Sequence, residues 1–483
     1  SGPLTPLSLF GRGVVTDPFP LFEDYETFSQ HAFIFVVPEG SFVLSIKEGY
    51  LMNPIINCLR MQDHAEEVIP GMTQLLSKHP GRFSRGVWPG YYRRACGVEI
   101  EDLDGNKYLD FSVGGIGATV LGYADPDVNA AVCRAIADGS ASSFNAPEEV
   151  LLADRLLELH PWAQRVRFAR SGGEAMALAV RIARAATGKN TVIFCGYHGW
   201  QDWYLAANLS KSDSLGEHLI PGISPIGVPP QLAGTAIPFH FNDIQDFKHA
   251  LAVAGNDLAA VVMEPMRNFP PDRAFIDTIH EETQRRKVPL VMDEISAGFR
   301  VCTGGMHRKL GYRPDMAVFA KALGNGFPIS AVIGKANVMQ GALKTFISST
   351  NWTERTGPAA ALAVIDKFER LNVSEHLVSL GQRVKAGWQE IAARHRLAIK
   401  ISGIDPMLHL HFCENHSQAT AFYTQEMLKR GFLAGSLFYA MHAHTPKQLE
   451  KFLENTDAVW QKIAAGNYSL EGQPAESGFQ RIN

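Results

Sequence analysis

The chain has 483 residues, of which 46% are hydrophobic and 19% are charged, and its formal net charge is −4. A chain of this length predicts two to three folding units with ample core, and its composition is that of a globular protein rather than a disordered one. The balanced charge argues against a nucleic-acid-binding protein, and no apolar stretch approaches the ~20 residues of a membrane-spanning helix.

The six cysteines are scattered along the chain and form no C-x-x-C motif. In a chain of this length, this pattern predicts reduced thiols rather than a disulfide framework. The first residues also lack the basic stretch and the apolar core of a signal peptide. We therefore expect a cytoplasmic protein.

Residues 1–70 are rich in proline, phenylalanine and glycine, and 31–38 and 41–46 have the pattern of two short strands. We expect 1–70 to be an extension that packs on the body of the protein or on a second copy. The alternative is a lid over the mouth of a site.

Residues 71–147 are expected to form the N-terminal segment of a small domain. The alternation and the Asp-Gly-Asn turn within 97–111 predict a β-hairpin. A glycine-dense stretch follows at 113–123, where the backbone can approach a substrate or a second subunit closely. Asp125-Pro126 then predicts the start of a helix that reaches Ala137.

Residues 148–365 alternate between strand and helix patterns. The predicted strands are Arg165–Ala169, Thr191–Phe194, Ala259–Met263, Val288–Met292, Met316–Ala320 and Ser330–Gly334. Because the segments between them are long enough for crossover helices, we predict an α/β domain with a mostly parallel sheet and helices on both faces. The stretch 204–238 predicts a long loop, which either gates a site or is a plain surface excursion.

Residues 366–466 are expected to form the C-terminal part of the small α+β domain. Helix patterns occupy Ala386–His395, Ser417–Lys429 and Pro446–Ile463, and short strand patterns occupy Met407–Phe412 and Phe432–Leu433. Two histidine pairs in this region lack acidic or cysteine partners at metal-ligand spacing, so we expect no metal site. Residues 467–483 are expected to be a frayed tail.

Several strand patterns end in residues suited to ligand binding. Arg165–Ala169 runs into Ser171-Gly172-Gly173 and then an alanine-rich helix pattern. Glycines let the backbone approach an anion, and the N–H groups of a helix N-terminus favour negative charge. No G-x-x-x-x-G-K-[ST] motif of a nucleotide P-loop occurs. We interpret this segment as a phosphate-binding turn, although such turns also occur without a ligand.

Two later apolar runs end in charged residues. One ends in Asp293, at the carboxyl end of a predicted parallel strand, where α/β proteins place ligand contacts. A carboxylate there suits the protonated nitrogen of a pyridine ring, although an N-cap or a metal ligand is an alternative. The other ends in Lys321, before a glycine-rich turn. Burial favours a neutral amine that can form a Schiff base, unless the side chain reaches solvent.

Together with the aromatic segment Phe194–Trp200, these segments resemble the class III (fold type I) pyridoxal-phosphate aminotransferases. The resemblance is closest to the glutamate-1-semialdehyde 2,1-aminomutase-like branch, and it covers roughly residues 70–465. It implies a fold type I transferase with a large cofactor-binding domain at 148–365. It also implies a smaller α+β domain made from N- and C-terminal segments.

The resemblance implies that Lys321 holds pyridoxal 5'-phosphate and that Asp293 binds the pyridine nitrogen. The other residues expected at the cofactor are Ser171, Gly172 and Gly173 at the phosphate, Tyr197 at the ring face, and His198 and Glu264 beside them. The segment Trp352–Pro358 resembles the family's T-x-x-x-N-P motif, although Gly357 stands where asparagine is usual. It implies that Thr353 reaches the phosphate of a neighbouring subunit in a homodimer with shared active sites.

The implied activity moves an amino group from an amine or amino acid donor to a carbonyl acceptor through a Schiff base at Lys321. An intramolecular aminomutase and a racemase of the same fold are the alternatives. A non-catalytic protein that binds a phosphate-bearing ligand is a third. We expect small-molecule substrates and neither nucleic acid nor membrane as a partner.

The substrate is less well defined by the sequence. In the aminomutases, the segment that matches Phe83–Tyr92 carries a carboxylate-binding arginine, but here Pro89 or Gly90 takes that place. The nearby aromatic residues are Trp88, Tyr91 and Tyr92, with Trp200 and Trp203 further along the chain. They predict a differently shaped pocket, for an amino sugar or a biosynthetic intermediate. We also expect Asn268 near the cofactor's ring hydroxyl. For Glu294 and Arg300 we expect structural ion pairs, with a catalytic role as the alternative.

Overall fold

The computed structural model describes residues 52–219, 221–266, 268–466 and 469–475. The strands predicted at 31–38 and 41–46 lie outside these ranges, as does most of the predicted extension. None of the helices in the described ranges is both long enough and apolar enough to cross a membrane.

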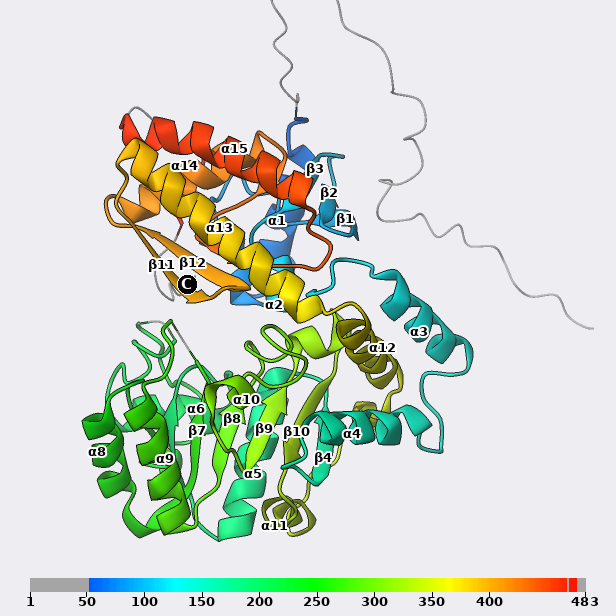
Figure 1. The fold of residues 1–483 in the computed structure, drawn as a ribbon, viewed down its shortest axis with the longest axis vertical. Helices are drawn as coiled ribbons and strands as arrows, with labels where there is room; N and C mark the ends of the chain where they lie inside the picture. Colours follow the sequence, from blue (N-terminus) through cyan, green and yellow to red (C-terminus); the bar gives the residue numbers. More distant parts are fainter. Residues whose placement is uncertain (1–51, 220, 267, 467–468, 476–483) are drawn as a thin grey trace, which may run out of the picture. The chain divides into compact units, whose positions relative to one another are not determined.

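A seven-stranded sheet forms the centre of the fold, with the order β4-β10-β9-β8-β7-β5-β6 (Figure 1). Its strands are β4 (Arg165–Ala169), β5 (Thr191–Cys195), β6 (Ala236–Pro238), β7 (Leu258–Met263), β8 (Leu290–Asp293), β9 (Met316–Phe319) and β10 (Ser330–Gly334). β10 is antiparallel to both of its neighbours, and the other pairs are parallel. The mostly parallel sheet is therefore confirmed, and all its strands except β10 end at one edge.

Both faces of this sheet are buried, since successive side chains of a strand point to opposite sides. In β7, Ala260 and Val262 pack in the core that contains α5 (Gly172–Thr187). Val261 and Met263 pack in the core on the other face, which contains α8 (Ile244–Ala254) and α9 (Arg273–Arg286) (Figure 1). This double burial explains why the strands read as unbroken apolar runs.

Two smaller sheets complete the fold. One has the order β1-β2-β3-β13, with β1 (Tyr92–Cys96), β2 (Glu99–Asp102), β3 (Lys107–Asp110) and β13 (Phe432–Leu433). The other is antiparallel and consists of β11 (Ile399–Ile404), β12 (Met407–Phe412) and β14 (Leu437–Tyr439). Because β13 pairs with β3, the N- and C-terminal segments share one sheet, as predicted.

Three long helices belong to the C-terminal segment: α13 (Val373–His395), α14 (His416–Leu428) and α15 (Pro446–Ala464). They lie against one another above β11 and β12 in Figure 1. The remaining helices are α1 (Ile56–Val68), α2 (Gly114–Gly117), α3 (Pro126–Ala137), α4 (Pro147–Leu159), α6 (Asp202–Leu205), α7 (Ala207–Ser210), α10 (His307–Leu310), α11 (Ala336–Met339) and α12 (Thr356–Arg370).

The expectation of a frayed tail is wrong for residues 469–475. The carbonyl of Ser469 accepts a hydrogen bond from Gln425 Nε2 (2.9 Å), and the N–H of Gln473 donates to the carbonyl of Arg85 (2.9 Å). These backbone groups have partners in the body of the protein, so this segment is anchored. Its polar composition gave no sign of these distant partners.

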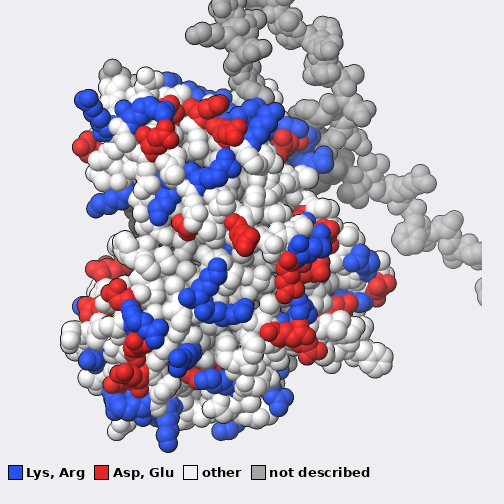
Figure 2. All heavy atoms as spheres, viewed as in Figure 1, with Lys and Arg blue, Asp and Glu red and all other residues white. Residues whose placement is uncertain are grey.

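Figure 2 shows one face of the molecule, on which basic and acidic side chains are interspersed. Many of the described charges are paired across elements. On α12, Lys367 Nζ lies 2.7 Å from Asp125 Oδ2 and 3.1 Å from Asp127 Oδ2, which ties this helix to the start of α3. The visible face therefore carries no continuous basic surface.

Candidate active site

A cavity of about 270 Å³ lies at the carboxyl edge of the central sheet. The predicted site residues that line it are Ser171, Gly172, Gly173, Tyr197, His198, Asp293 and Lys321. They follow or end β4, β5, β8 and β9, four strands that point the same way. The carboxyl ends of such strands meet at one edge, so residues far apart in the sequence converge there.

Lys321 lies two residues after the end of β9, and its backbone is left-handed, with φ 45°. This conformation is uncommon for a side chain with a Cβ, and strained residues often occur at functional sites. Its Nζ lies 2.7 Å from the Oγ of Ser296. Burial lowers the pKa of Lys321, and Asp293 nearby opposes this shift. The local environment therefore makes this ammonium group easier to deprotonate than a lysine in water.

Asp293 is the last residue of β8 and is only 4% exposed. Its Oδ1 accepts a hydrogen bond from the N–H of Ile295 (3.0 Å), and its Oδ2 lies 2.8 Å from His198 Nδ1. The other ring nitrogen of His198 lies 3.1 Å from the carbonyl oxygen of Cys195. Trp203 stacks near the imidazole of His198, with ring centroids 6.1 Å apart. The carboxylate is thus held in one orientation from two sides.

Ser171 is the N-cap of α5 and forms a capping box with Glu174, so this helix start is well defined. A Cβ on Gly172 would lie 2.9 Å from the Cδ1 of Ile295, and a Cβ on Gly173 would overlap the side-chain amide of Gln201. Glycines at both positions therefore leave these two side chains undisturbed. They bring backbone N–H groups at the positive end of a 16-residue helix to the cavity, which suits an anion.

Tyr197 follows β5 and is 41% exposed, with its ring at the cavity. Its backbone N–H donates to Glu264 Oε2 (3.2 Å). Glu264 is not among the residues that line the cavity, but it follows β7 and raises the pKa of Lys321 through space. Glu264 therefore holds the backbone of Tyr197 from outside the cavity.

Thr353 lies outside this cavity. It is exposed, and its hydroxyl donates to the carbonyl of Thr350 (3.0 Å) within a short 3₁₀ turn. The neighbouring Trp352 lines a separate surface groove, together with Trp200 and Trp203. Trp200 and Trp203 thus lie apart from the aromatic residues at 88–92, contrary to the shared pocket that the sequence suggested.

Asn268 is also exposed and does not line the cavity. Its carbonyl accepts a hydrogen bond from the N–H of Gly403 (3.1 Å). The expected contact with a ring hydroxyl is therefore not supported within the described residues.

Two further residues lie near Lys321: Ser296, which was not predicted, and Arg300, for which a catalytic role was the alternative to an ion pair. Ser296 lies three positions after Asp293 and contacts Lys321 directly. Arg300 is fully buried, donates from Nε to the carbonyl of Ser296 (3.2 Å), and also donates to the carbonyl of Gly117. Burial lowers the pKa of Arg300 to about 10. The expected ion pair is thus replaced by backbone contacts, whereas Glu294 does pair with His307 Nδ1 (2.7 Å).

A second cavity, of about 350 Å³, adjoins the first, and Ala118 and Gly326 line both. We call it the aromatic chamber because its lining includes Phe83, Trp88, Tyr91, Tyr92, Tyr108 and Tyr123. Within the part of the chain that the structure describes, no arginine lines it. Trp88, Tyr91 and Tyr92 thus line a cavity beside the one that contains Lys321, in agreement with the prediction that the aromatic residues at 88–92 shape a pocket.

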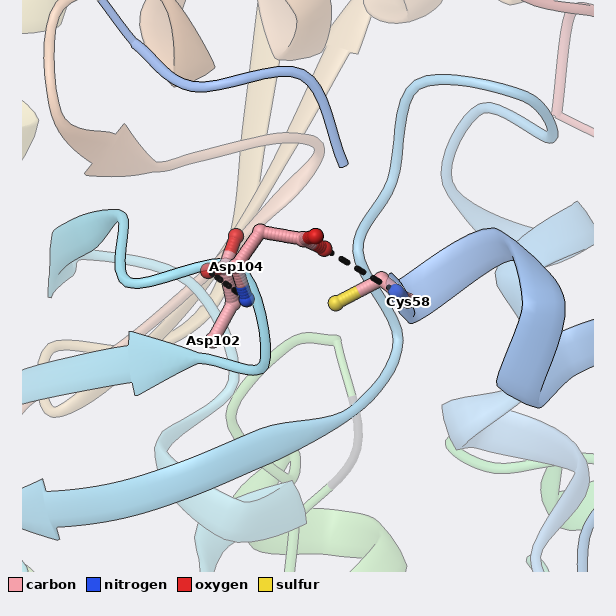
Figure 3. A group of neighbouring side chains, drawn as sticks. All are labelled: Cys58, Asp102 and Asp104. Atoms are coloured by element: carbon pink, nitrogen blue, oxygen red, sulfur yellow. Dashed lines mark hydrogen bonds between the residues drawn. The ribbon is translucent and has the colours of Figure 1, made fainter. Parts of the chain in front are cut away.

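Cys58, Asp102 and Asp104 lie together near the start of α1 (Figure 3), with one potential ligand atom of each within 4.8 Å of the others. The carboxylate of Asp104 accepts hydrogen bonds from the N–H groups of Asn57 (2.8 Å) and Cys58 (3.0 Å). Asp102 accepts from the side chain of Asn106 (2.9 Å). Burial raises the pKa of the Cys58 thiol to about 12. These contacts explain the group as a helix cap, and we assign it no metal.

The cavity at Lys321 fits pyridoxal phosphate. It offers an amine of lowered pKa, a fixed carboxylate, an aromatic ring and a glycine-lined helix N-terminus. Those are the groups needed by an aldehyde, a protonated pyridine nitrogen, a ring face and a phosphate, respectively.

Comparisons with known proteins agree with this fit. Residues 84–454 match the family model for aminotransferase class-III. The chain is 30% identical over 407 residues to 2'-deamino-2'-hydroxyneamine transaminase of Streptomyces kanamyceticus, covering 83% of this chain and 97% of that protein. It is 33% identical over 338 residues to glutamate-1-semialdehyde 2,1-aminomutase of Rhodopirellula baltica, covering 68% and 75%.

Among solved structures, one similar chain is the FumI protein of Sphingopyxis sp. MTA144 in its PLP internal aldimine form. The two chains have a TM-score of 0.78 and 26% identity, over 86% of this chain and 98% of that one. An omega-transaminase from Sphaerobacter thermophilus has a TM-score of 0.75 and 27% identity, over 85% and 98%.

Proposed function

The chain belongs to the class III aminotransferases, and on this premise we propose that the cavity between Lys321 and Asp293 transfers an amino group from a small-molecule amine to a separate carbonyl acceptor. The protein is a pyridoxal-phosphate-dependent enzyme of fold type I. The observation that carries the proposal is the convergence of Lys321, Asp293 and the N-terminus of α5 on one cavity.

When bound, pyridoxal phosphate supplies an aldehyde that condenses with amines and a ring that accepts the electron pair of a deprotonated carbon. Lys321 anchors the cofactor and, once free, carries a proton to and from the substrate carbon. Ser296 suits this role because its hydroxyl can donate to a neutral amine and accept from an ammonium group. It therefore holds Nζ, 2.7 Å away, in either protonation state.

The remaining residues bind and orient. Asp293 binds the pyridine nitrogen, and His198, 2.8 Å from its Oδ2, keeps the carboxylate in place. The N–H groups of Gly172 and Gly173, with Ser171, bind the phosphate, and Tyr197 covers one face of the ring. Glu264 fixes the backbone of Tyr197 through its N–H.

Overall, the donor loses its C–N bond and gains a carbonyl oxygen from water, while the acceptor loses its carbonyl oxygen as water and gains the amino group. Transfer between two molecules is favoured over an aminomutase because no arginine occurs among the described residues that line the aromatic chamber. A substrate that carries a carboxylate there would lack the bidentate partner that arginine provides. The relatives include proteins named for each activity, so the aminomutase stays the second candidate.

We also propose a homodimer with shared active sites. The exposed apolar side chains of Trp200 (72%) and Phe346 (83%) lie at the groove that Trp352 lines, next to Thr353. Apolar side chains this exposed favour burial against another surface. In such a dimer, Thr353 reaches the phosphate of the second subunit. The six cysteines are free, which fits the proposed location in the reducing cytoplasm.

The test is visible absorbance of the purified protein. Bound cofactor should give a yellow band that is altered in Lys321→Ala, and one amine should bleach it, with recovery when a keto acid is added. An aminomutase would instead convert a single substrate without any acceptor and without releasing a carbonyl product. A protein that pyridoxal phosphate does not colour would contradict the proposal.

A further inference from the structure

The aromatic chamber contains two buried carboxylates whose described hydrogen-bond donors are all neutral. Asp102 is 1% exposed and accepts from Tyr108 OH (3.1 Å) and Asn106 Nδ2 (2.9 Å). Asp110 is 2% exposed and accepts from Tyr123 OH and Ser112 Oγ, both at 2.6 Å. Buried carboxylates are usually paired with cations. These two lack an ion pair anywhere in the described part of the chain.

The cations near the chamber do not offset this charge. Lys78 is the one basic residue among the described residues of its lining, and its side chain is exposed. Of the nearby arginines, Arg85 pairs with Glu66, and Arg93 pairs with Glu101. Among the described residues, the lining of the chamber therefore holds two buried carboxylates and no buried basic side chain.

The aromatic rings favour the same kind of ligand. The face of a phenol ring attracts a cation, and the attraction grows when water is excluded. Tyr108 and Tyr123 donate their hydroxyl protons to carboxylates, which makes their rings more electron-rich. Phe83 and Trp88 stack on each other, with centroids 3.9 Å apart, and form an apolar wall. An ammonium group is attracted by both the rings and the carboxylates, whereas a carboxylate is repelled.

We propose that the amino donor is a diamine or polyamine whose second, non-reacting ammonium group binds in the aromatic chamber. The reacting amine lies at Lys321, and the chain between the two nitrogen atoms passes the shared wall of Ala118 and Gly326. This inference rests on the proposed function, because it assigns a substrate class to the same site. In this assignment Asp102 and Asp110 select the substrate by attracting its second ammonium group, and they do not contact the reacting carbon.

The test compares three series of amines of increasing length on the holoenzyme, with pyruvate as acceptor. α,ω-Diamines carry a distal ammonium, n-alkylamines carry none, and ω-amino acids carry a distal carboxylate. We expect the best diamine to exceed the alkylamine of equal length about tenfold in kcat/KM, and the ω-amino acid to fall below both. Equal or higher kcat/KM for the alkylamine or the ω-amino acid would overturn the assignment.

Asp110→Asn removes the charge and keeps the shape of the side chain. It should reduce the diamine-to-alkylamine ratio about tenfold, and Asp102→Asn should act in the same direction if the first variant does not fold. Glu99→Gln is the matched control, because this carboxylate on β2 is exposed, pairs with Lys107 and does not line the chamber. An unchanged ratio in a folded Asp110→Asn would contradict the inference.

The two levels of the proposal fail in different ways. If alkylamines react as well as diamines, transamination stands and only the second ammonium site is wrong. If no amine of any series bleaches the bound cofactor, the proposed function itself is wrong.

Discussion

Gly357 offers a direct test of how tightly α12 packs against the cofactor cavity. A Cβ at this position would lie 2.5 Å from the carbonyl oxygen of Pro328 and 3.2 Å from the Cβ of Ile329, and both of these residues line the cavity. In Gly357→Ala, either α12 or the cavity wall must move by several tenths of an ångström. Overpacking of this kind costs about 1–3 kcal/mol, whereas alanine in place of helical glycine returns only about 0.5–1 kcal/mol.

The difference of about 1–2 kcal/mol is a loss of folding stability, and where the cavity wall moves to relieve it, we expect pyridoxal phosphate to bind roughly tenfold more weakly. The assay is titration of the apoprotein with the cofactor, followed by visible absorbance. Gly387→Ala is the control, since a Cβ there meets only the end of the Leu453 side chain, on α13 and α15. An unchanged affinity in Gly357→Ala, or an equal loss in the control, would refute the packing argument.

Burial alone would raise the pKa of Glu426, but hydrogen bonds from Lys462, Lys429 and Arg430 hold it at about 2, below the ordinary 4.5. This stabilisation is present above pH 4.5 and is lost as the pH falls toward 2, so Glu426→Gln should flatten the fall of the melting temperature with acid. Lys367→Met leaves buried Asp125 without its cation and should cost about 3–5 kcal/mol in urea unfolding. The double variant Lys367→Met/Asp125→Asn should recover part of that loss. If it recovers nothing, the unpaired charge of Asp125 is not the cause of the destabilisation. Ser296→Ala removes the hydroxyl that contacts Lys321 Nζ and should shift the pH profile of kcat. If Ser296 were merely structural, the variant would bind less cofactor but keep the same pH profile.

The core of the site was predictable because each of its parts follows a short apolar run. Lys321, Asp293 and Ser171 come directly after, or at the end of, runs that form β9, β8 and β4. In a parallel sheet such positions meet at one edge, so the sequence order was enough to bring them together. Their chemical roles, which the resemblance supplied, remain for the absorbance and kinetic experiments to test.

The contacts that were missed depend on partners distant in the sequence. The hydrogen bonds from Arg300 to Gly117, and from Gln473 to Arg85, join segments separated by more than a hundred residues. No local pattern marks such pairs. The strand β6 has only three residues, which is too short for a strand pattern to stand out from the loop around it.

The antiparallel direction of β10 was also not predicted. Its apolar run is like those of its neighbours, because it is buried on both faces in the same way. Burial sets the composition of a strand, but the connection that precedes it sets its direction. The turn after Lys321 is short and brings the chain straight back along β9, which leaves no room for a crossover helix.

The position of β4 at the edge of the sheet, paired with β10 alone, affects how the protein folds during synthesis. β4 begins at Arg165, whereas β10 begins at Ser330, about 165 residues later. A ribosome that adds ~5–20 residues per second takes roughly 10–30 s to cover that interval, during which β4 has no strand to pair with. The Ser171–Gly173 turn after β4 is thus made early and positioned late. We expect cofactor binding to require β10, although no residue of β10 itself lines the cavity at Lys321.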